Sequence, residues 1–435
     1  MAIKTIRHFV KQQDGAMTAF GLFLGLSSLV IGGLAIDVAN AMMARTQLQA
    51  AADSAAHAAL YVREFEDSAT AKQAALDVAY VNMPAARFGS LLTEDDIQFG
   101  YWDRDANAFQ IDPDSNGAVF VDISRLASKG NSVGTYFLRF AGFGSWDVRR
   151  GAVFETYIPS CFREGFVAED VVDMQSSNTF LNGFCIHSNT HAEVQNNNTF
   201  ASNTVVSMPD KRDLVMPSGG FSTNLGLQDA LRDAYYRIRI LDQVQDIIDD
   251  LYAGGATYAP DYITAPGVIS VNTRTNLSMA DFTTGRIHKV TCNGGQTLPF
   301  QSGATLTDIV LVTNCKVKFG ANVVLDNVVL ATSNTASNSV YGPSAVQVGR
   351  DDGCATNGGS QVLTMGGMKF AANLSMYGGQ LIAQLDIDFS ANGNGVEGAS
   401  FIAGGRIDGT SSTNMGLCGS GMERTFEAEY FRLAS

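Results

Sequence analysis

The feature that most constrains this chain is an uncharged segment close to its N-terminus. Residues Ala16 to Ile36 read AMTAFGLFLGLSSLVIGGLAI, 21 residues without one charged side chain. About 20 helical residues cross the hydrocarbon core of a bilayer, so this run predicts a single transmembrane helix over residues 16–36. A buried helix of a soluble domain is the weaker interpretation, because uncharged runs of this length are uncommon there. The anchor residues of the predicted span are Ala16, Phe20, Leu24, Leu29 and Ile36.

Charged residues on the two sides of the run predict its orientation. Lys4, Arg7 and Lys11 precede it, and Asp37 follows it. The positive-inside rule then places residues 1–15 in the cytoplasm and the rest of the chain on the other side of the membrane. A cleaved signal peptide is the alternative, although the apolar run is long and no A-x-A site stands cleanly at its end.

An alanine-rich stretch follows the predicted span and is expected to continue it as one rod. Leu48, Ala52, Ala55, Ala59 and Val62 recur at spacings of four, three, four and three, which places them on one helical face. Alanine along that face lets a partner backbone approach closely. The partner is either a helix or sheet of the same chain or a neighbouring subunit, and the residues leave both open.

Composition excludes some classes of protein. With 46% apolar and 17% charged residues, the chain is not a largely disordered protein. The formal net charge is −14, from 43 acidic and 29 basic residues, which argues against nucleic acid as a partner. The 44 glycines against 9 prolines are typical of the turns in a protein with many short strands.

The N-terminal stretch resembles a known family. A short basic lead and the dipeptide DG precede the span, and IDVANAMMARTQLQAAADSAAHAAL follows it, with Asp37, Arg45, Leu48, Gln49 and Asp53 in order. This pattern is similar to the N-terminal signature of TadG-type proteins of the tight-adherence (Flp-type) pilus system. The resemblance implies a single-pass protein of a bacterial inner membrane, with its bulk periplasmic or extracellular. It also implies partners among the other pilus-assembly proteins, such as pseudopilins and the secretion machinery.

The resemblance extends more weakly beyond the alanine-rich helix. The segments Ile97–Phe109 and Val133–Glu155 resemble the α+β module that follows in such proteins. Residues 37–158 are therefore expected to form the alanine-rich helix and a small sheet packed on it.

Two departures from the family pattern narrow the expected role. Pilins of this system are cut after a glycine and carry glutamate at the fifth mature position, where this sequence places Phe20 after Gly15. A stably anchored assembly factor is thus favoured over a polymerising subunit. Many longer TadG-type proteins carry a von Willebrand A-like domain whose metal site needs Asp-x-Ser-x-Ser. Here Asp122 and Ser124 are followed by Leu126, so we expect no such metal site.

Residues 159–435 contain repeats of about twenty residues. LTDIVLVTN begins at Leu306 and LDNVVLATSN at Leu325, while LIAQLDID begins at Leu381 and FIAGGRID at Phe401. Apolar runs that alternate with Asn, Thr, Ser and Gly turns at this period predict a mainly β domain, a right-handed parallel β-helix. A β-sandwich is the alternative.

Two further segments bear on the C-terminal region. The asparagine-rich turn QNNNTF, residues 195–200, favours the β-helix, because stacked asparagines commonly line its bends. A helix-like segment over residues 225–254 interrupts the repeats and is expected to lie against the β-helix as an insertion.

All six cysteines lie beyond residue 160, which suits an exported, oxidising location. Sequential pairing would leave separations of 24, 23 and 64 residues, and the first two pairs would then join adjacent coils. Six cysteines allow fifteen pairings, so this connectivity is one hypothesis among several. The disulfide candidates are Cys161, Cys185, Cys292, Cys315, Cys354 and Cys418.

No catalytic, cofactor-binding or metal-binding constellation stands out. Asp351 and Asp352 are adjacent, so on a strand they would point to opposite faces, and a solvated turn is the simpler interpretation. His187 and His191 have a helical spacing in a strand-and-turn context, where they would lie over about 13 Å apart. The glycines of residues 366–380 lack the spacing of a phosphate-binding loop. We expect no enzyme activity, cofactor or metal.

Two classes of function remain. The favoured one is a membrane-anchored structural or assembly component of a tight-adherence pilus. Its β-helix would be exposed outside the inner membrane for contact with a protein or a surface glycan, including a role in cell adhesion. The alternative is a membrane-anchored polysaccharide-active β-helix enzyme, which a group of carboxylates converging on one exposed face would favour.

Overall fold

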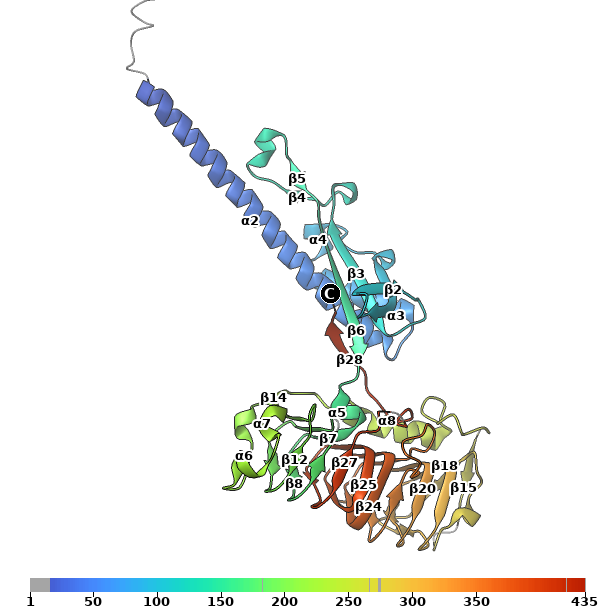
Figure 1. The fold of residues 1–435 in the computed structure, drawn as a ribbon. Helices are drawn as coiled ribbons and strands as arrows, with labels where there is room; N and C mark the ends of the chain where they lie inside the picture. Colours follow the sequence, from blue (N-terminus) through green and yellow to red (C-terminus); the bar gives the residue numbers. More distant parts are fainter. Residues whose placement is uncertain (1–15, 182, 266, 273–274, 420, 435) are drawn as a thin grey trace, which may run out of the picture. The chain divides into compact units, whose positions relative to one another are not determined.

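The computed structural model describes residues 16–181, 183–265, 267–272, 275–419 and 421–434. The expected cytoplasmic lead, residues 1–15, lies outside the described residues, as does the side chain of Ala16. The chain divides into two compact units (Figure 1). The first contains the chain up to Tyr157 together with Glu429–Ser435, and the second is Ile158–Ala428.

The first unit is built on one continuous helix, α2 (Ala16–Arg63), of 48 residues. It is long and apolar enough to cross a membrane. Its N-terminal half is exposed: the side chains of Phe20, Leu24, Leu29 and Ile36 expose 58%, 48%, 61% and 50% of their surface. The predicted span and the alanine-rich segment therefore form one rod, as the continuous apolar and alanine-rich sequence predicts.

The C-terminal half of α2 is buried in its own chain. Leu48, Ala52, Ala55 and Ala59 are fully buried and pack against helix α3 (Ser68–Asn82) and the strands of the first unit. Of the two partners that the sequence left open, the helix face is thus occupied by an internal one. α3 presents a matching row of small side chains, Ala71, Ala75 and Ala79.

This close helix contact predicts a large penalty for added volume. Ala55→Leu is expected to destabilise the first unit by about 1–3 kcal/mol, because extra methylenes in a packed core force shifts of neighbouring side chains and backbone. The measurement is urea unfolding of the full chain in detergent, followed by tryptophan fluorescence, because Trp102 and Trp146 both lie in this unit. Ala50→Leu, at an exposed position of the same helix, is the control and should change little. Equal effects at both positions would contradict the packing.

The first unit holds a five-stranded antiparallel sheet in the order β2-β1-β3-β6-β28. Its edge strand β28 comes from the C-terminus of the chain and pairs with β6, with Tyr430 opposite Tyr157. From the sequence, these residues are expected in the C-terminal domain. That assignment is wrong for β28, because strand pairing with β6 places it in the first unit. The strands are β1 (Ile97–Asp103), β2 (Ala108–Ile111), β3 (Ala118–Arg125), β6 (Val148–Tyr157) and β28 (Tyr430–Leu433).

A short hairpin extends from this unit toward the N-terminal half of α2 (Figure 1). It consists of β4 (Val133–Gly134) and β5 (Ser145–Trp146), which pair antiparallel. The turn between them, residues 135–144, contains η3 (Leu138–Ala141) and is called the aromatic turn below. The remaining short helices of the unit are α4 (Ala85–Phe88), η1 (Glu94–Asp96) and η2 (Ala127–Lys129).

The second unit contains a parallel assembly of 21 strands. The strands are β7 (Gly165–Ala168), β8 (Val172–Met174), β9 (Thr179–Phe180), β10 (Cys185–Ser188), β11 (Ala192–Val194), β12 (Thr199–Phe200), β13 (Val205–Met208), β14 (Leu231–Asp233), β15 (Val268–Ser270), β16 (Arg286–Val290), β17 (Thr297–Pro299), β18 (Thr305–Thr313), β19 (Lys316–Lys318), β20 (Val324–Thr332), β21 (Val340–Gly342), β22 (Gln347–Val348), β23 (Gln361–Thr364), β24 (Met368–Ala383), β25 (Ile387–Ala403), β26 (Ile407–Asp408) and β27 (Asn414–Gly416). Its short helices are α5 (Ser160–Arg163), α6 (Gly220–Thr223), α7 (Leu227–Ala230), η4 (Lys211–Asp213) and η5 (Met279–Asp281).

The repeats seen in the sequence lie side by side in this assembly. Leu306 pairs with Leu325, and Leu381 pairs with Phe401, so segments that align in sequence are direct neighbours in space. The strands form three stacks, because β7, β8 and β9 each pair with their counterparts β10, β11 and β12 twenty residues further on. Buried apolar side chains of all the stacks meet in one core.

The order of strands within the stacks does not follow the order of the chain. The chain enters at β7, in the middle of its stack, and proceeds through β10 and β13 to β14. It then resumes at β15 and proceeds through successive neighbours to β25, which pairs with β7. β26 and β27 pair in the same way with β8 and β9. We call this junction between the last and the first strands the seam.

Helix α8 (Arg239–Ala253) lies in the connection from β14 to β15 and contacts β18, β23 and β24. The helix predicted over residues 225–254 is therefore shorter than expected. Leu231–Asp233 instead forms β14, in which Leu231 pairs with Val206 and extends the stack. The apolar face of α8 is buried and consists of Ile240, Leu241, Val244, Ile247, Ile248 and Leu251.

Buried asparagines line one bend of the assembly. Asn178, Asn198 and Asn224 each expose 1% of their surface. The Oδ1 atom of Asn198 accepts the backbone N–H of Asn178 at 2.8 Å, and that of Asn224 accepts the N–H of Asn198 at 3.0 Å. Asn178 Oδ1 accepts the N–H of Thr413 at 3.1 Å, so the ladder continues across the seam. These bonds satisfy backbone donors that the turns would otherwise leave buried and unpaired.

Three disulfides cross-link the second unit. They join Cys161 to Cys185, Cys292 to Cys315, and Cys354 to Cys418, which is the sequential pairing. The first joins helix α5, just before β7, to β10, and the second joins the segments that follow β16 and β18. The third ties the loop before β23 to the segment after β27.

Candidate functional site

One face of α2 holds the aromatic turn near the end of the apolar run. Gly33 contacts Phe137, and a Cβ atom at position 33 would lie 2.6 Å from Cγ of that ring, so glycine permits the approach. One helical turn further on, the Asp37 carboxylate accepts the backbone N–H groups of Tyr136, Phe137 and Leu138 at 2.6, 2.9 and 2.6 Å. The turn is thereby fixed to the helix at two successive levels.

Asp37 stays ionised in this position. Burial raises its pKa, but the N–H groups of Leu138, Tyr136 and Phe137, with the Arg139 guanidinium nearby, outweigh burial and hold the pKa below its usual value. Because the folded pKa is lowered, the stabilisation from Asp37 is complete above the ordinary aspartate pKa. It is lost as the pH falls through the lowered pKa, so docking of the turn weakens only below the ordinary aspartate pKa.

Asp37→Asn is expected to release the aromatic turn from α2. An amide offers one acceptor oxygen, and its NH₂ group would face backbone donors. Hydrogen exchange at the amides of residues 136–138, in the full chain in detergent, should quicken roughly tenfold or more, because bonds to an ionised acceptor are the stronger ones. Asn40→Ala is the control, since it removes one bond, from Nδ2 to the carbonyl oxygen of Gly134 at 3.0 Å. Unchanged exchange in the Asp37→Asn chain would contradict the docking role.

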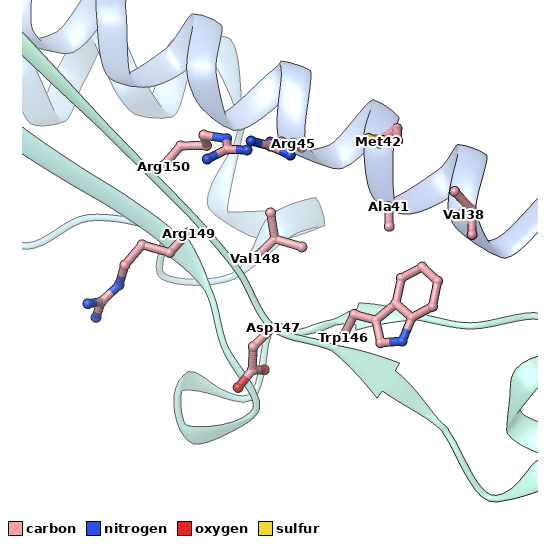
Figure 2. Close-up of a pocket in the computed structure, with 9 residues that line it drawn as sticks. All are labelled: Val38, Ala41, Met42, Arg45, Trp146, Asp147, Val148, Arg149 and Arg150. Atoms are coloured by element: carbon pink, nitrogen blue, oxygen red, sulfur yellow. The ribbon is translucent and has the colours of Figure 1, made fainter. Parts of the chain in front are cut away.

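Beside this contact lies a hollow of about 430 Å³ between α2 and the strands β5 and β6 (Figure 2). It begins on the helix directly after the apolar run and carries three arginines. We call it the arginine hollow. Its lining consists of Val38, Ala41, Met42, Arg45, Trp146, Asp147, Val148, Arg149 and Arg150.

The arginines of the hollow differ in their surroundings. Figure 2 shows Arg45 and Arg150 directed toward the same space from α2 and from β6, whereas Arg149 is directed away. Arg149 forms an ion pair with Asp122, with 3.4 Å between Nε and Oδ2. Within the described part of the chain, no hydrogen bond or ion pair engages the side chain of Arg45 or Arg150. Two unpaired guanidinium groups that face one space can donate hydrogen bonds to carboxylate or phosphate oxygens.

Two family models match separate parts of the chain. Residues 165–419 match the model described as "Domain of unknown function (DUF7867)", which spans more than half of the sequence. The chain belongs to the DUF7867 family. Residues 15–79 match the Tad model, described as "Putative Flp pilus-assembly TadE/G-like", which confirms the resemblance to a TadG-like protein of the Flp pilus system. No curated protein matches the chain.

The Tad match covers one side of the site only. It includes Gly33, Asp37 and Arg45 on α2 and ends before the strands that supply Trp146 and Arg150. The DUF7867 match begins at β7 and ends just after β27, so it covers the three stacks of the second unit. The family that matches more than half of the chain thus has a description that assigns no function.

The stacks of this DUF7867 protein also carry a row of carboxylates in register. Glu193 pairs with Asp173, Asp173 with Asp408, and Asp408 with Asp388, on four adjacent strands. Burial raises the pKa of Asp173 even though Arg406 opposes this, and Arg406 forms an ion pair with its Oδ2 atom.

Cations lie beside several of these carboxylates. Arg406 also lies 4.0 Å from Glu193, and Lys369 Nζ lies 3.4 Å from Asp388. Hydrolysis of a glycosidic bond needs one carboxyl to donate a proton and another to act as nucleophile or base. Arg406 and Lys369 engage three of the four carboxylates in ion pairs.

The histidines and the Asp351–Asp352 pair considered from the sequence belong to the second unit. His187 is buried, with Nδ1 at 2.8 Å from Ser207 Oγ and Nε2 at 2.9 Å from Asn189 Oδ1. His191 pairs with Glu193 instead. Asp352 accepts the N–H of Ala355 at 2.9 Å in a turn. Among the described residues, no group of three or more His, Cys, Asp or Glu side chains could hold a metal ion.

Sequence reasoning identified only part of this site. Asp37 and Arg45 belong to the family signature, but the signature implies no role for either side chain. The spacing of four residues on α2 is the signal that could have indicated the site. Gly33, Asp37, Ala44 and Leu48 recur at spacings of four, seven and four, and all are buried on one face of the helix. Trp146 and Arg150 carry no recognisable motif, and only the course of β5 and β6 beside α2 brings them to the helix.

Proposed function

We propose that this DUF7867 protein is a membrane-anchored structural component of Flp pilus assembly, without catalytic activity of its own. The observation that carries the proposal is the TadE/G-like match over residues 15–79, which coincides with α2 and α3. α2 combines an exposed apolar half and a half buried in the first unit within one helix. Such a rod suits a protein that holds a folded part close to a membrane.

In this proposal α2 crosses the bacterial inner membrane once. The basic residues Lys4, Arg7 and Lys11 support a cytoplasmic N-terminus, so both folded units lie on the periplasmic or extracellular side. Three disulfides in the second unit support the same location, because disulfides persist in oxidising compartments.

The second unit is proposed to be a right-handed parallel β-helix. Strand registers that advance by 19 and 20 residues, three stacks of parallel strands and the asparagine ladder support this form. Right-handedness is supported by the strong general preference of parallel strand connections. Its long exposed faces would supply the surface for a protein or glycan ligand.

The arginine hollow is proposed as a docking point for another pilus-assembly protein, through acidic groups of that partner. Arg45→Ala combined with Arg150→Ala is expected to lower the number of pili severalfold, because charge-assisted bonds to a partner carboxylate would be lost. Arg149→Ala is the matched control, because this arginine is directed away and pairs with Asp122. Equal numbers of pili in both variants would contradict the docking role of the hollow.

The whole proposal is tested by counting pili by electron microscopy in the source bacterium after deletion of the gene, with surface attachment in parallel. One strain receives the whole chain. A second receives the first unit alone, in which the segment up to Tyr157 is joined through a Gly/Ser linker to Glu429–Ser435, so that β28 still pairs with β6.

Loss of pili that the whole chain restores would support the assembly role. Restoration by the first unit alone would place the assembly function there and leave the second unit for contact with a ligand. Normal pili and normal attachment in the deletion strain would overturn the proposal. Cleavage of polysaccharides by the purified chain would support the enzymatic alternative instead.

A further inference from the structure

The aromatic turn carries large side chains that the first unit leaves uncovered. Tyr136, Phe140 and Phe143 expose 59%, 81% and 63% of their surface. The turn reads TYFLRFAGFG and contains no acidic residue. A cluster of exposed aromatic side chains is unfavourable in water, because each Å² of apolar surface removed from water contributes about 25 cal/mol. Such a cluster indicates a surface that is covered in the working protein.

The contacts of the turn with α2 set its level along the rod. Phe137 packs on Gly33, which lies three residues inside the apolar run that ends at Ile36. A helix rises 1.5 Å per residue, so this contact lies about 4.5 Å inside the end of the run. Just beyond the run, Asp37 holds the turn and Asn40 holds Gly134 of the adjoining strand β4. The turn therefore lies at the level where the hydrocarbon of a bilayer would meet the headgroups.

Much of the backbone of the turn is hydrogen-bonded, and each bonded N–H group lowers the cost of an apolar environment. Asp37 accepts three of its N–H groups. Four further N–H groups donate to carbonyl oxygens inside the turn. The bonds run from Thr135 to Gly144 at 3.1 Å, from Phe140 to Phe137 at 3.0 Å, from Gly142 to Arg139 at 3.2 Å and from Phe143 to Leu138 at 3.1 Å. The Thr135 hydroxyl donates to Phe143 O at 2.5 Å.

The one charged side chain of the turn also fits a membrane boundary. The Arg139 guanidinium lies over the ring of Phe140, 5.3 Å from its centroid. Arginine can lay its aliphatic stem along apolar surface while its charge stays among lipid phosphates. Aromatic side chains with tyrosine among them are typical of membrane–water interfaces.

We propose that the aromatic turn is a second membrane contact, which inserts Phe140 and Phe143 into the outer leaflet beside α2. The occupant of the aromatic surface is thus the phospholipid bilayer. The inference rests on the proposed membrane anchor, because α2 must span for the turn to reach lipid. Two contacts on one rigid unit would fix the tilt and rotation of α2, and would hold the arginine hollow at a constant height above the membrane.

The test uses the full chain reconstituted in phosphatidylcholine vesicles, with the native tryptophans removed as Trp102→Phe and Trp146→Phe. A single tryptophan is then introduced as Phe140→Trp. Lipids brominated near the headgroup or near the bilayer centre quench tryptophans at their own depth, and iodide quenches those in water. Far-UV circular dichroism checks that each chain is folded.

Two control chains make the result specific. Phe23→Trp reports on the middle of the predicted span and tests the anchor itself. Tyr101→Trp reports on a side chain of β1 that is 50% exposed in the same unit and lies outside the aromatic turn. The proposal expects loss of fluorescence at position 140 with shallow bromine and little loss with iodide. Position 23 should respond to deep bromine, and position 101 to iodide.

The contrary outcomes are distinct. Quenching of position 140 by iodide, with position 23 still quenched by deep bromine, would overturn the second contact and leave the anchor standing. Protection of position 140 from both quenchers would mean that protein, such as a second copy of the chain, covers the turn, and would overturn the lipid contact. Iodide quenching of position 23 would overturn the anchor and the second contact together.

Discussion

Phe166→Ala is expected to destabilise the second unit by about 3–5 kcal/mol, the usual cost of truncating a fully buried phenylalanine. Phe166 is fully buried at the seam, where it pairs with Phe401 of β25. Its ring lies 4.9 Å from the rings of Phe184 and Phe401 and 5.4 Å from that of Phe389, measured between centroids. The variant removes a side chain that joins the first and last strands of the unit.

Urea unfolding of the full chain in detergent, followed by far-UV circular dichroism, measures this effect. Tryptophan fluorescence reports separately on the first unit, because both tryptophans lie there. Phe221→Ala is the control within the second unit, since Phe221 is 41% exposed and should cost less than about 1 kcal/mol. Similar midpoints for the two variants would contradict the seam as a centre of stability.

Removing the disulfide between Cys354 and Cys418 is expected to lower the stability of the second unit by about 4 kcal/mol. The bond closes a loop with a sequence separation of 64 residues, and on a chain-entropy estimate longer loops lose more freedom in the unfolded state. It also holds the segment after β27, where Glu164 accepts the N–H groups of Cys418 and Gly419 at 2.5 and 2.6 Å. Replacement of both cysteines by serine makes the change.

The comparison for this variant is the pair Cys292→Ser and Cys315→Ser. Their bond spans 23 residues, so its loss should cost about 3 kcal/mol by the same argument. Urea midpoints of the two double variants, measured under non-reducing conditions, give the order. A larger loss for the shorter loop would show that native contacts at that bond, and not loop entropy, dominate.

Patterns that are local in sequence predicted the rod and the repeated strands. The uncharged run and the alanines at spacings of three and four residues predicted the single helix α2, because helical periodicity is visible within a short window. The repeats at Leu306 and Leu325 predicted neighbours, because strands that recur at one period stack on each other. The TadG resemblance was carried by the same N-terminal segment and is confirmed there.

The candidate site could be predicted only in part. Asp37 and Arg45 were visible in the family signature, but Trp146 and Arg150 join them through contacts about one hundred residues away in sequence. Nothing in the local pattern of residues 133–155 indicates which face of α2 they meet. In the sequence Gly33 is only one member of an apolar run, although its missing side chain admits Phe137.

By itself, the sequence determined that the chain has one long helix, apolar and then alanine-rich, and a C-terminal region of short repeated strands. Only the tertiary structure decided that the repeats close at a seam of β25 against β7, and that Tyr430–Leu433 returns to the first sheet. The physical reason is the separation in sequence of the residues that make each contact. Periodicity reports which side chains share a face over a few turns or strands, whereas the seam and β28 are hydrogen-bonded contacts between residues more than 230 positions apart.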